Sequence, residues 1–179
     1  MKLRLFFFAL LLSMGFTGAY AQHFGYVDTD YILSQMTEYR GAQKQLNEIS
    51  QKWETELKTM KDEVDKMYKD YKAEEILLSA VQKKEREDAI VAKEDAMKKF
   101  EQDKFGVNGE LFKKRQELIK PIQDKVFAAV QKVAKDNNLD FIFDKSANMN
   151  ILFSNPKYDR SDDVLEVLGV TPIEIKEDK

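Results

Sequence analysis

The stretch YRGAQKQLNEISQKWETELKTMKDEVDKMYKDY, residues 39–71, decides the fold. Its apolar residues recur at steps of three and four, and mostly polar residues lie between them. The stripe consists of Tyr39, Ala42, Leu46, Ile49, Trp53, Leu57, Met60, Val64, Met67 and Tyr71. The mean step lies between the periods of an ideal helix and of a coiled coil. A stripe this narrow predicts a long helix that packs along one seam and leaves most of its surface in water.

A second long helix is predicted over residues 79–135, because Ser79 and Gln82 have the spacing of a capping box. Its apolar stripe is weaker than that of the first helix. Pro121 lacks a backbone donor, so we expect the helix to end there and a further segment to begin at Ile122. That segment is expected to bury Val126, Val130 and Val133, and Asn137-Asn138 favours a left-handed stop. The hairpin seam is therefore expected to contain Leu46, Ile49, Trp53, Leu57, Val64, Ile90, Met97, Phe100 and Leu111.

The chain can turn back at residues 75–79 or at residues 106–109. The first choice gives two arms of similar length, 33–75 and 79–120, each about 60 Å long at 1.5 Å per residue, and we prefer it because equal arms return the chain to its start. Gly106 and Gly109 then lie inside the descending helix, where each costs about 1 kcal/mol against alanine. They are a candidate hinge, or else a tolerated local irregularity.

The flanks differ in kind from the arms. Segments 24–28, 139–144 and 150–153 are aromatic or β-branched and are predicted to be strands, with 145–149 as the turn between the last two. A short helix over 164–168 should be capped from within 159–163 and end at Gly169, followed by a tail. Three short strands cannot bury a core alone, so we expect a small oligomer that shares one barrel or sheet. Its expected core is Phe24, Tyr26, Val27, Phe141, Phe143, Ile151 and Phe153, and this pattern leaves the number of subunits open.

The first 21 residues are typical of a cleaved secretory signal peptide. Lys2 and Arg4 precede an apolar run to Met14, and Ala19-Tyr20-Ala21 provides small residues for cleavage before Gln22. The apolar run is shorter than the roughly 20 residues that span a bilayer. We therefore expect four parts: the signal peptide 1–21, a body of 22–32 and 121–169, a helical arm of 33–120 with its tip near 75–79, and a flexible tail of 170–179.

No residue constellation points to an enzyme, a cofactor or a metal site. The chain has no cysteine, which excludes disulfides and thiolate ligands, and its only histidine, His23, has no recognisable partner. The acidic clusters alternate with lysines and arginines, as on a solvated helix face, and a pI near 5.4 does not favour nucleic-acid binding. We expect a protein that is not an enzyme.

The chain resembles the Skp (OmpH) family of periplasmic chaperones. The resemblance is carried by KRQELIKPI at 114–122, by LDFIFD at 139–144 and by YDRSDDVLEVLG at 158–169, after a strand that ends in Tyr26-Val27-Asp28. It implies an α+β, mostly α chain: a homotrimer with a shared β-barrel body and three coiled-coil hairpin arms around a cavity. It also implies a periplasmic holdase that shields unfolded outer-membrane proteins without ATP.

One property departs from that family. Its best-known members are strongly basic, whereas residues 40–120 here carry 19 Lys and Arg against 18 Asp and Glu. This balance argues against long-range electrostatic capture of acidic clients, lipopolysaccharide or a membrane surface. Client contacts must then rely on apolar and short-range polar groups.

Two sets of apolar residues are candidate client contacts. Phe105, Phe112 and Ile119 recur every seven residues beside the seam, where they either face the cavity or broaden the packing face. Ile76, Leu77 and Leu78 lie at the tip, where they either contact a client or close the hairpin. Alternative interpretations of the whole chain are a structural or adaptor coiled coil of the envelope and a prefoldin-like chaperone, the latter disfavoured by the signal peptide.

Overall fold

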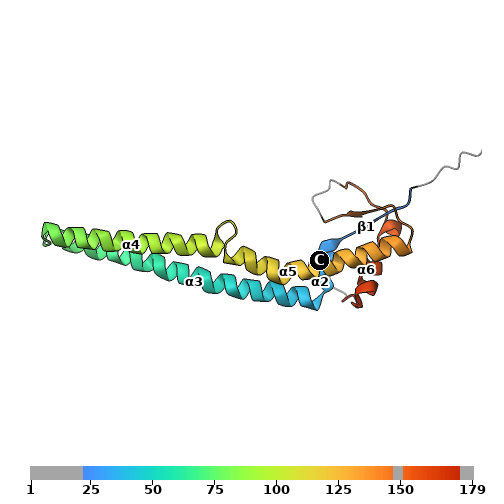
Figure 1. The fold of residues 1–179 in the computed structure, drawn as a ribbon, viewed down its shortest axis with the longest axis horizontal. Helices are drawn as coiled ribbons and strands as arrows, with labels where there is room; N and C mark the ends of the chain where they lie inside the picture. The colour runs from blue at the N-terminus through green and yellow to red at the C-terminus, as the bar shows by residue number, and fades with distance from the viewer. Residues whose placement is uncertain (1–21, 147–150, 174–179) are drawn as a thin grey trace, which may run out of the picture.

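The computed structural model describes residues 22–146 and 151–173. A long arm of two helices projects from a small body, and the first and last described residues both lie at the body (Figure 1). In chain order the elements are β1 (Phe24–Val27), α2 (Thr29–Gln35), α3 (Thr37–Glu74), α4 (Ala80–Phe105), α5 (Glu110–Asp136), β2 (Phe141–Asp144), η1 (Pro156–Tyr158) and α6 (Ser161–Leu168).

In the arm, α3 runs antiparallel to α4 in the distal part and to the first part of α5 nearer the body (Figure 1). α3 has 38 residues and is therefore about 57 Å long. The chain turns back over 75–79, as predicted, and the predicted capping box opens α4: the Ser79 N–H donates to Gln82 Oε1 at 3.0 Å, and Ser79 Oγ accepts from the Gln82 N–H. These paired contacts satisfy amide groups that the first turn leaves free.

The return path differs from the prediction at two places. Helix α4 ends at Phe105 and α5 begins at Glu110, so Gly106 and Gly109 lie in a loop instead of inside a helix. Pro121, in contrast, lies within α5 and does not end it. Pro121 is exposed, so water can reach the backbone carbonyl that it leaves without a donor, and Ile119 and Ile122 anchor the helix on either side. α5 changes direction along its length (Figure 1).

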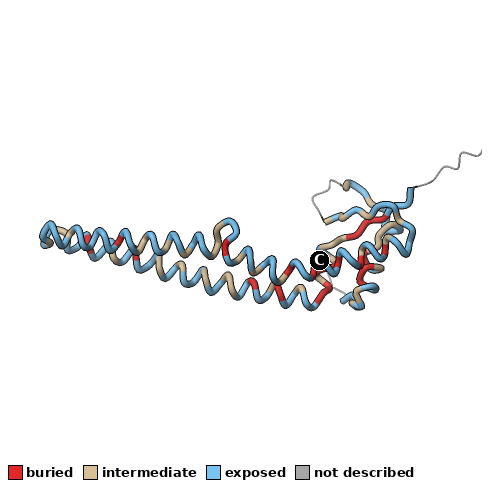
Figure 2. The backbone as a smooth tube through the Cα atoms, viewed as in Figure 1, coloured by how far each residue is buried: buried red, intermediate tan, exposed pale blue. Residues whose placement is uncertain are grey.

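The core lies in the body and at the base of the arm, where the buried residues concentrate (Figure 2). Helix α5 contributes a long row of core residues, spaced three and four positions apart as expected. Val130 was predicted to be buried in this row, but Ala129 is buried there and Val130 is only partly buried. The core comprises Val27, Ile32, Leu33, Met36, Ala42, Leu46, Ile119, Ile122, Val126, Ala129, Val133, Val164 and Leu165.

The sheet brings together segments from the two ends of the chain. β1 and β2 pair in parallel, with Phe24 opposite Phe141 and Val27 opposite Asp144. Asp159 bridges Tyr26 on the other edge of β1, and the Arg160 N–H donates to the Tyr26 carbonyl at 2.8 Å.

The third predicted strand, over 150–153, is wrong for residues 151–153, which form no strand; Asn150 and the predicted turn residues 147–149 lie outside the described residues. High β-propensity does not make a strand without a partner, and the second edge of β1 is occupied by the Asp159 segment.

Both predicted helix stops near the body are confirmed. Asn138 has a φ of 51°, directly after α5. Gly169 has a φ of 69° and ends α6, where its N–H donates to the carbonyls of Glu166 and Leu165. A left-handed residue at this position lets the chain leave a helix while its last carbonyls keep donors.

Candidate functional site

The arm has a thin apolar seam. Leu46, Val64 and Ile90 are buried in it. The other seam residues predicted from the sequence are partly buried: Ile49, Trp53, Leu57, Met97, Phe100 and Leu111. Ile90 is the only buried residue of α4, so apolar contacts alone do not hold the distal half of the arm together.

Polar contacts across the hairpin supplement this seam. The Tyr71 hydroxyl donates to the Glu87 carboxylate, and this hydrogen bond, with burial and the nearby carboxylates, raises the pKa of Tyr71 to about 12. Lys93 pairs with Glu63 at 2.6 Å and Arg86 with Glu74 at 3.3 Å. Surface pairs of this kind each contribute little stability, so the two helices of the distal arm are held together only weakly.

The tip exposes apolar side chains to solvent. Ile76 is 94% exposed and Leu77 is 85% exposed, whereas Leu78 is partly buried against the hairpin. Val81, on the first turn of α4, is also exposed. Of the two interpretations of the tip, hairpin closure therefore applies only to Leu78, and none of the described residues covers Ile76 or Leu77.

Phe105 and Phe112 do not share one environment. The Phe105 ring is partly buried and meets the Trp53 ring edge-on, with 6.2 Å between ring centroids. Phe112 is 47% exposed on the first turns of α5. The structure thus places Phe105 in the packing between α3 and α4, and leaves Phe112 available on the surface.

The Gly106–Gly109 loop interrupts the arm midway and carries an exposed Val107 at its outer side. A Cβ on Gly106 would lie 2.4 Å from the Gln102 carbonyl oxygen, and one on Gly109 would lie 2.9 Å from the Gly106 oxygen. Close backbone approach therefore requires glycine at both positions.

One face of the body is aromatic and uncovered. Phe24, Phe141, Phe143 and Phe153 are exposed, whereas Tyr26 and Val27 are buried and Ile151 is partly buried. The Phe141 and Phe143 rings stack with centroids 6.3 Å apart. Exposed aromatic clusters of this kind mark surfaces that contact another molecule.

A groove of about 440 Å³ lies between the sheet and α5, lined by Val27, Leu33, Val126, Phe127 and Ile142 among others.

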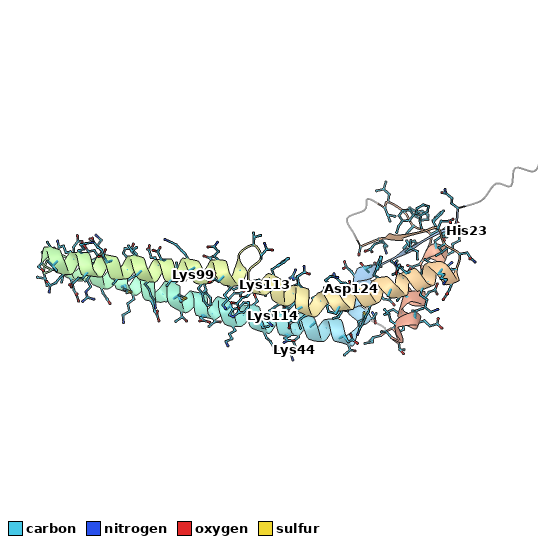
Figure 3. All side chains as sticks on the ribbon, in the orientation of Figure 1. His23, Lys44, Lys99, Lys113, Lys114 and Asp124 are labelled. Atoms are coloured by element: carbon cyan, nitrogen blue, oxygen red, sulfur yellow. The ribbon has the colours of Figure 1, made fainter. Side chains whose placement is uncertain are left out.

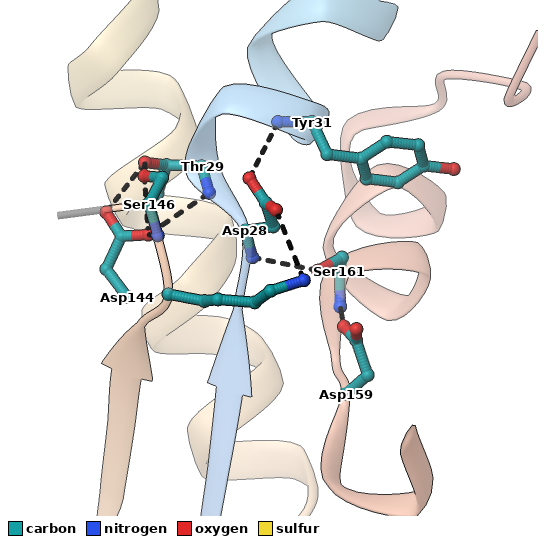
Figure 4. Close-up of polar contacts among 8 residues, drawn as sticks. Asp28, Thr29, Tyr31, Asp144, Ser146, Asp159 and Ser161 are labelled. Carbon is teal, nitrogen blue, oxygen red and sulfur yellow. Dashed lines mark hydrogen bonds and ion pairs between the residues drawn. The ribbon is translucent and has the colours of Figure 1, made fainter. Parts of the chain in front are cut away.

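A polar junction joins the two strands to α2 and α6 (Figure 4). The Asp144 carboxylate accepts from the hydroxyl and N–H of Thr29, at 2.6 and 3.2 Å, and from the hydroxyl and N–H of Ser146. Burial alone would raise the pKa of Asp144, but these hydrogen bonds outweigh it and hold the pKa below its usual value.

Asp28 is the second centre of this junction. Its carboxylate caps α2 by accepting from the Tyr31 N–H at 3.0 Å, and its own N–H donates to Ser161 Oγ at 2.9 Å. The Ser161 N–H donates to Asp159, which closes the link to the last helix. From the sequence, Ser161 falls only within the range 159–163 expected to cap the last helix, and no polar role is predicted for Asp28 or Asp144, although an aspartate between a strand and a helix is a recognisable cap signal.

The described residues hold no arrangement that suggests catalysis. In the ranges 22–146 and 151–173, no three His, Asp or Glu side chains are grouped to bind a metal ion. None of the helices in those ranges has the length and apolar character that crossing a bilayer requires. His23 lies at the body end of the molecule (Figure 3), where its backbone N–H donates to the Asp140 carboxylate.

A mostly helical chain with a long hairpin arm, a small body and a two-stranded parallel sheet defines the fold, and apolar side chains are exposed at the tip and on the body. The chain belongs to the OmpH-like outer membrane protein family, whose model matches residues 23–168.

A solved structure shares this fold. It is the crystal structure of an OmpH-like outer membrane chaperone candidate from Caulobacter crescentus CB15, which aligns with a TM-score of 0.64 at 18% identity and covers 86% of this chain and 88% of that one. No curated protein matches the chain. At this identity the likeness concerns the fold.

Proposed function

We propose that the protein is an ATP-independent holdase chaperone of the periplasm, which binds unfolded outer-membrane proteins and prevents their aggregation. The observation that carries the proposal is the uncovered apolar tip on an arm about 57 Å from end to end, in a chain of the OmpH-like family. The related Caulobacter structure, described as a candidate outer membrane chaperone, supports the same class of function.

The charge pattern favours short-range capture. Lysines and acids pair along the helices, for example Lys84 with Asp88 at 3.0 Å and Lys99 with Asp103 at 2.8 Å. Charges neutralised in this way attract a distant client weakly. Many weak apolar contacts hold an unfolded chain and still release it, so Ile76, Leu77 and Phe112 are the contacts that we assign to the client.

We further propose a homotrimer in which the aromatic face of the body is covered by neighbouring copies. Phe24, Phe141 and Phe143 lie on the two strands of a sheet that has no third strand among the described residues. A two-stranded sheet is marginal alone, and pairing between copies would extend it into the shared barrel expected for this family. The arms would then surround a common cavity.

The proposal is tested by diluting an outer-membrane β-barrel protein out of urea in the presence of the mature chain, residues 22–179. Light-scattering mass should show an oligomer that gains the mass of one soluble client. The variant Ile76→Gln with Leu77→Gln keeps side-chain size and removes apolar character, and should protect the client several-fold less well at unchanged oligomer mass.

Val107→Gln is the matched control, because Val107 is as exposed as the tip residues but lies in the mid-arm loop. Equal protection by the tip variant and the wild type would reject the tip as a contact. An assembled wild-type protein that lets the client precipitate would reject the holdase role and favour an adaptor coiled coil of the envelope.

A further inference from the structure

Lys104 contacts all three long helices at the point where the arm is interrupted. It lies on the last turn of α4, and its ammonium is 4.9 Å from the centre of the Trp53 ring on α3 and 5.7 Å from that of Phe100. The same ammonium donates to Glu110 Oε1, on the first turn of α5, at 2.7 Å. The Lys104 side chain is only 20% exposed, much less than those of the other paired lysines of the arm.

The surroundings of Lys104 make this point of the arm different from the rest. Elsewhere two continuous helices run side by side, but here only α3 is continuous, because the Gly106–Gly109 loop separates α4 from α5. A helix resists bending through its hydrogen-bond ladder, so a break in one of two helices creates a compliant point. The direction of the distal arm then depends on side chains that span the break.

We propose that Lys104, Trp53 and Glu110 form a latch that sets the angle between the distal arm and the body. The cation over Trp53 ties α4 to α3, and the ion pair with Glu110 ties α4 to α5 across the loop. With the latch closed the arm holds one direction; with the latch open the distal arm swings about the loop. The latch exists independently of any client, but an arm angle that it sets would fix the width of the proposed cavity.

The chain supplies its own reporters. Trp53 is its only tryptophan and it has no cysteine, so cysteines introduced at Ala89 on α4 and Gln131 on α5 are unique sites for spin labels. Both positions are exposed. Labelled chains are refolded with an excess of unlabelled chains so that each assembly holds at most one labelled pair, and the distance distribution between the labels reports the arm angle.

Lys104→Met keeps the apolar stem of the side chain and removes the contacts of the ammonium with Trp53, Phe100 and Glu110. A cation–π contact shifts a two-state equilibrium by roughly 2- to 30-fold, so the distance distribution should broaden clearly. Acrylamide should also quench Trp53 more strongly. Glu110→Gln removes only the charge pair, and should broaden the distribution less and leave the quenching unchanged.

Lys99→Met is the matched control, because Lys99 pairs with Asp103 at 2.8 Å within α4 and contacts neither α3 nor α5 through that pair. It should leave both readouts as in the wild type. Helical content and oligomer mass are measured for every variant, so that unfolding is recognised as such. A folded Lys104→Met protein in which Trp53 quenching rises while the distance distribution stays narrow would contradict the latch. Lys104 would then contribute only to local packing.

Discussion

Single carboxylates at the junction of the body hold distant parts of the chain together. Asp144 ends β2 and binds the first residue of α2, Thr29, which lies 115 positions earlier. Asp28 caps α2 and, through its backbone, binds Ser161 of α6. The Asp144 carboxylate therefore stabilises a contact between segments far apart in the chain, and its protonation state bears on the stability of the body.

Asp144→Asn should reduce the free energy of unfolding by roughly 1–3 kcal/mol near neutral pH, because it weakens hydrogen bonds to an ionised acceptor. Since the pKa of Asp144 is lowered in the folded state, the stabilisation is present above the usual aspartate value of about 4 and is lost as the pH falls through the lowered pKa. Denaturant melts at several pH values should show the difference from wild type shrinking as the pH falls below about 4.

Asp124→Asn is the control for that experiment. Asp124 pairs with Lys120 on the exposed side of α5, where both side chains are more than half exposed. Its replacement should change stability by less than about 1 kcal/mol at any pH. An Asp144→Asn deficit that persists unchanged into strong acid would contradict the linkage to its carboxylate.

Tyr71 gives the arm a dependence on alkaline pH. Because its hydrogen bond to Glu87 needs the protonated hydroxyl, the stabilisation is present below the usual tyrosine pKa of about 10 and is lost as the pH rises through about 12. Tyr71→Phe removes that bond, so its helical signal should fall less than that of the wild type between about pH 10 and 12. Parallel titration curves for the two proteins would argue against the bond.

At the scale of elements, helices and turns that depend on neighbouring residues could be predicted from the sequence. The period of residues 39–71 specified α3, and Ser79 with Gln82 specified where α4 begins. The sequence marks Gly106 and Gly109 as a hinge or local irregularity, but the full break depends on a close backbone approach that only the folded loop shows. The continuity through Pro121 depends on this residue facing solvent. Whether residues 151–153 form a strand depends on partners far away in the chain, and so does the parallel pairing of β1 with β2.

Two glycines of the arm should respond oppositely to alanine. Gly41 lies within α3 with no atom within 4 Å of an added Cβ, so Gly41→Ala should raise stability by about 0.5–1 kcal/mol. Gly106→Ala places its Cβ 2.4 Å from the Gln102 carbonyl oxygen and should lower stability by about 1–3 kcal/mol. Thermal melts of the two variants test this, and a tolerated Gly106→Ala would show that the loop adapts at little cost.

At the scale of the whole molecule, the exposed aromatic face of the body is the surface through which the proposed oligomer would form. The same residues that the sequence marked as an oligomerisation core divide in the structure: Tyr26 and Val27 are buried within the chain, whereas Phe141 and Phe143 lie on its surface. Surface aromatics add little to the stability of one chain, so their contribution should appear in self-association.

Phe143→Ala should therefore weaken the association between chains more than it destabilises the fold of each chain. We expect the light-scattering mass of dilute samples to fall toward that of one chain, with the far-ultraviolet helical signal retained. Val91→Ala removes a similarly exposed apolar residue from the arm and should leave the mass unchanged. An unchanged mass for Phe143→Ala at all concentrations would place Phe143 outside the assembly interface.

The parallel pairing of β1 with β2 also constrains the order of events when the protein is made. β1 emerges at residues 24–27, but its partners are residues 141–144 on one edge and Asp159 on the other, so more than a hundred residues must be synthesised before either can form. Pairing across such a sequence separation is slow, because the intervening chain must close a large loop. The nascent chain can form its arm early, whereas the aromatic strand β1 stays unpaired until residues 141–159 have been synthesised.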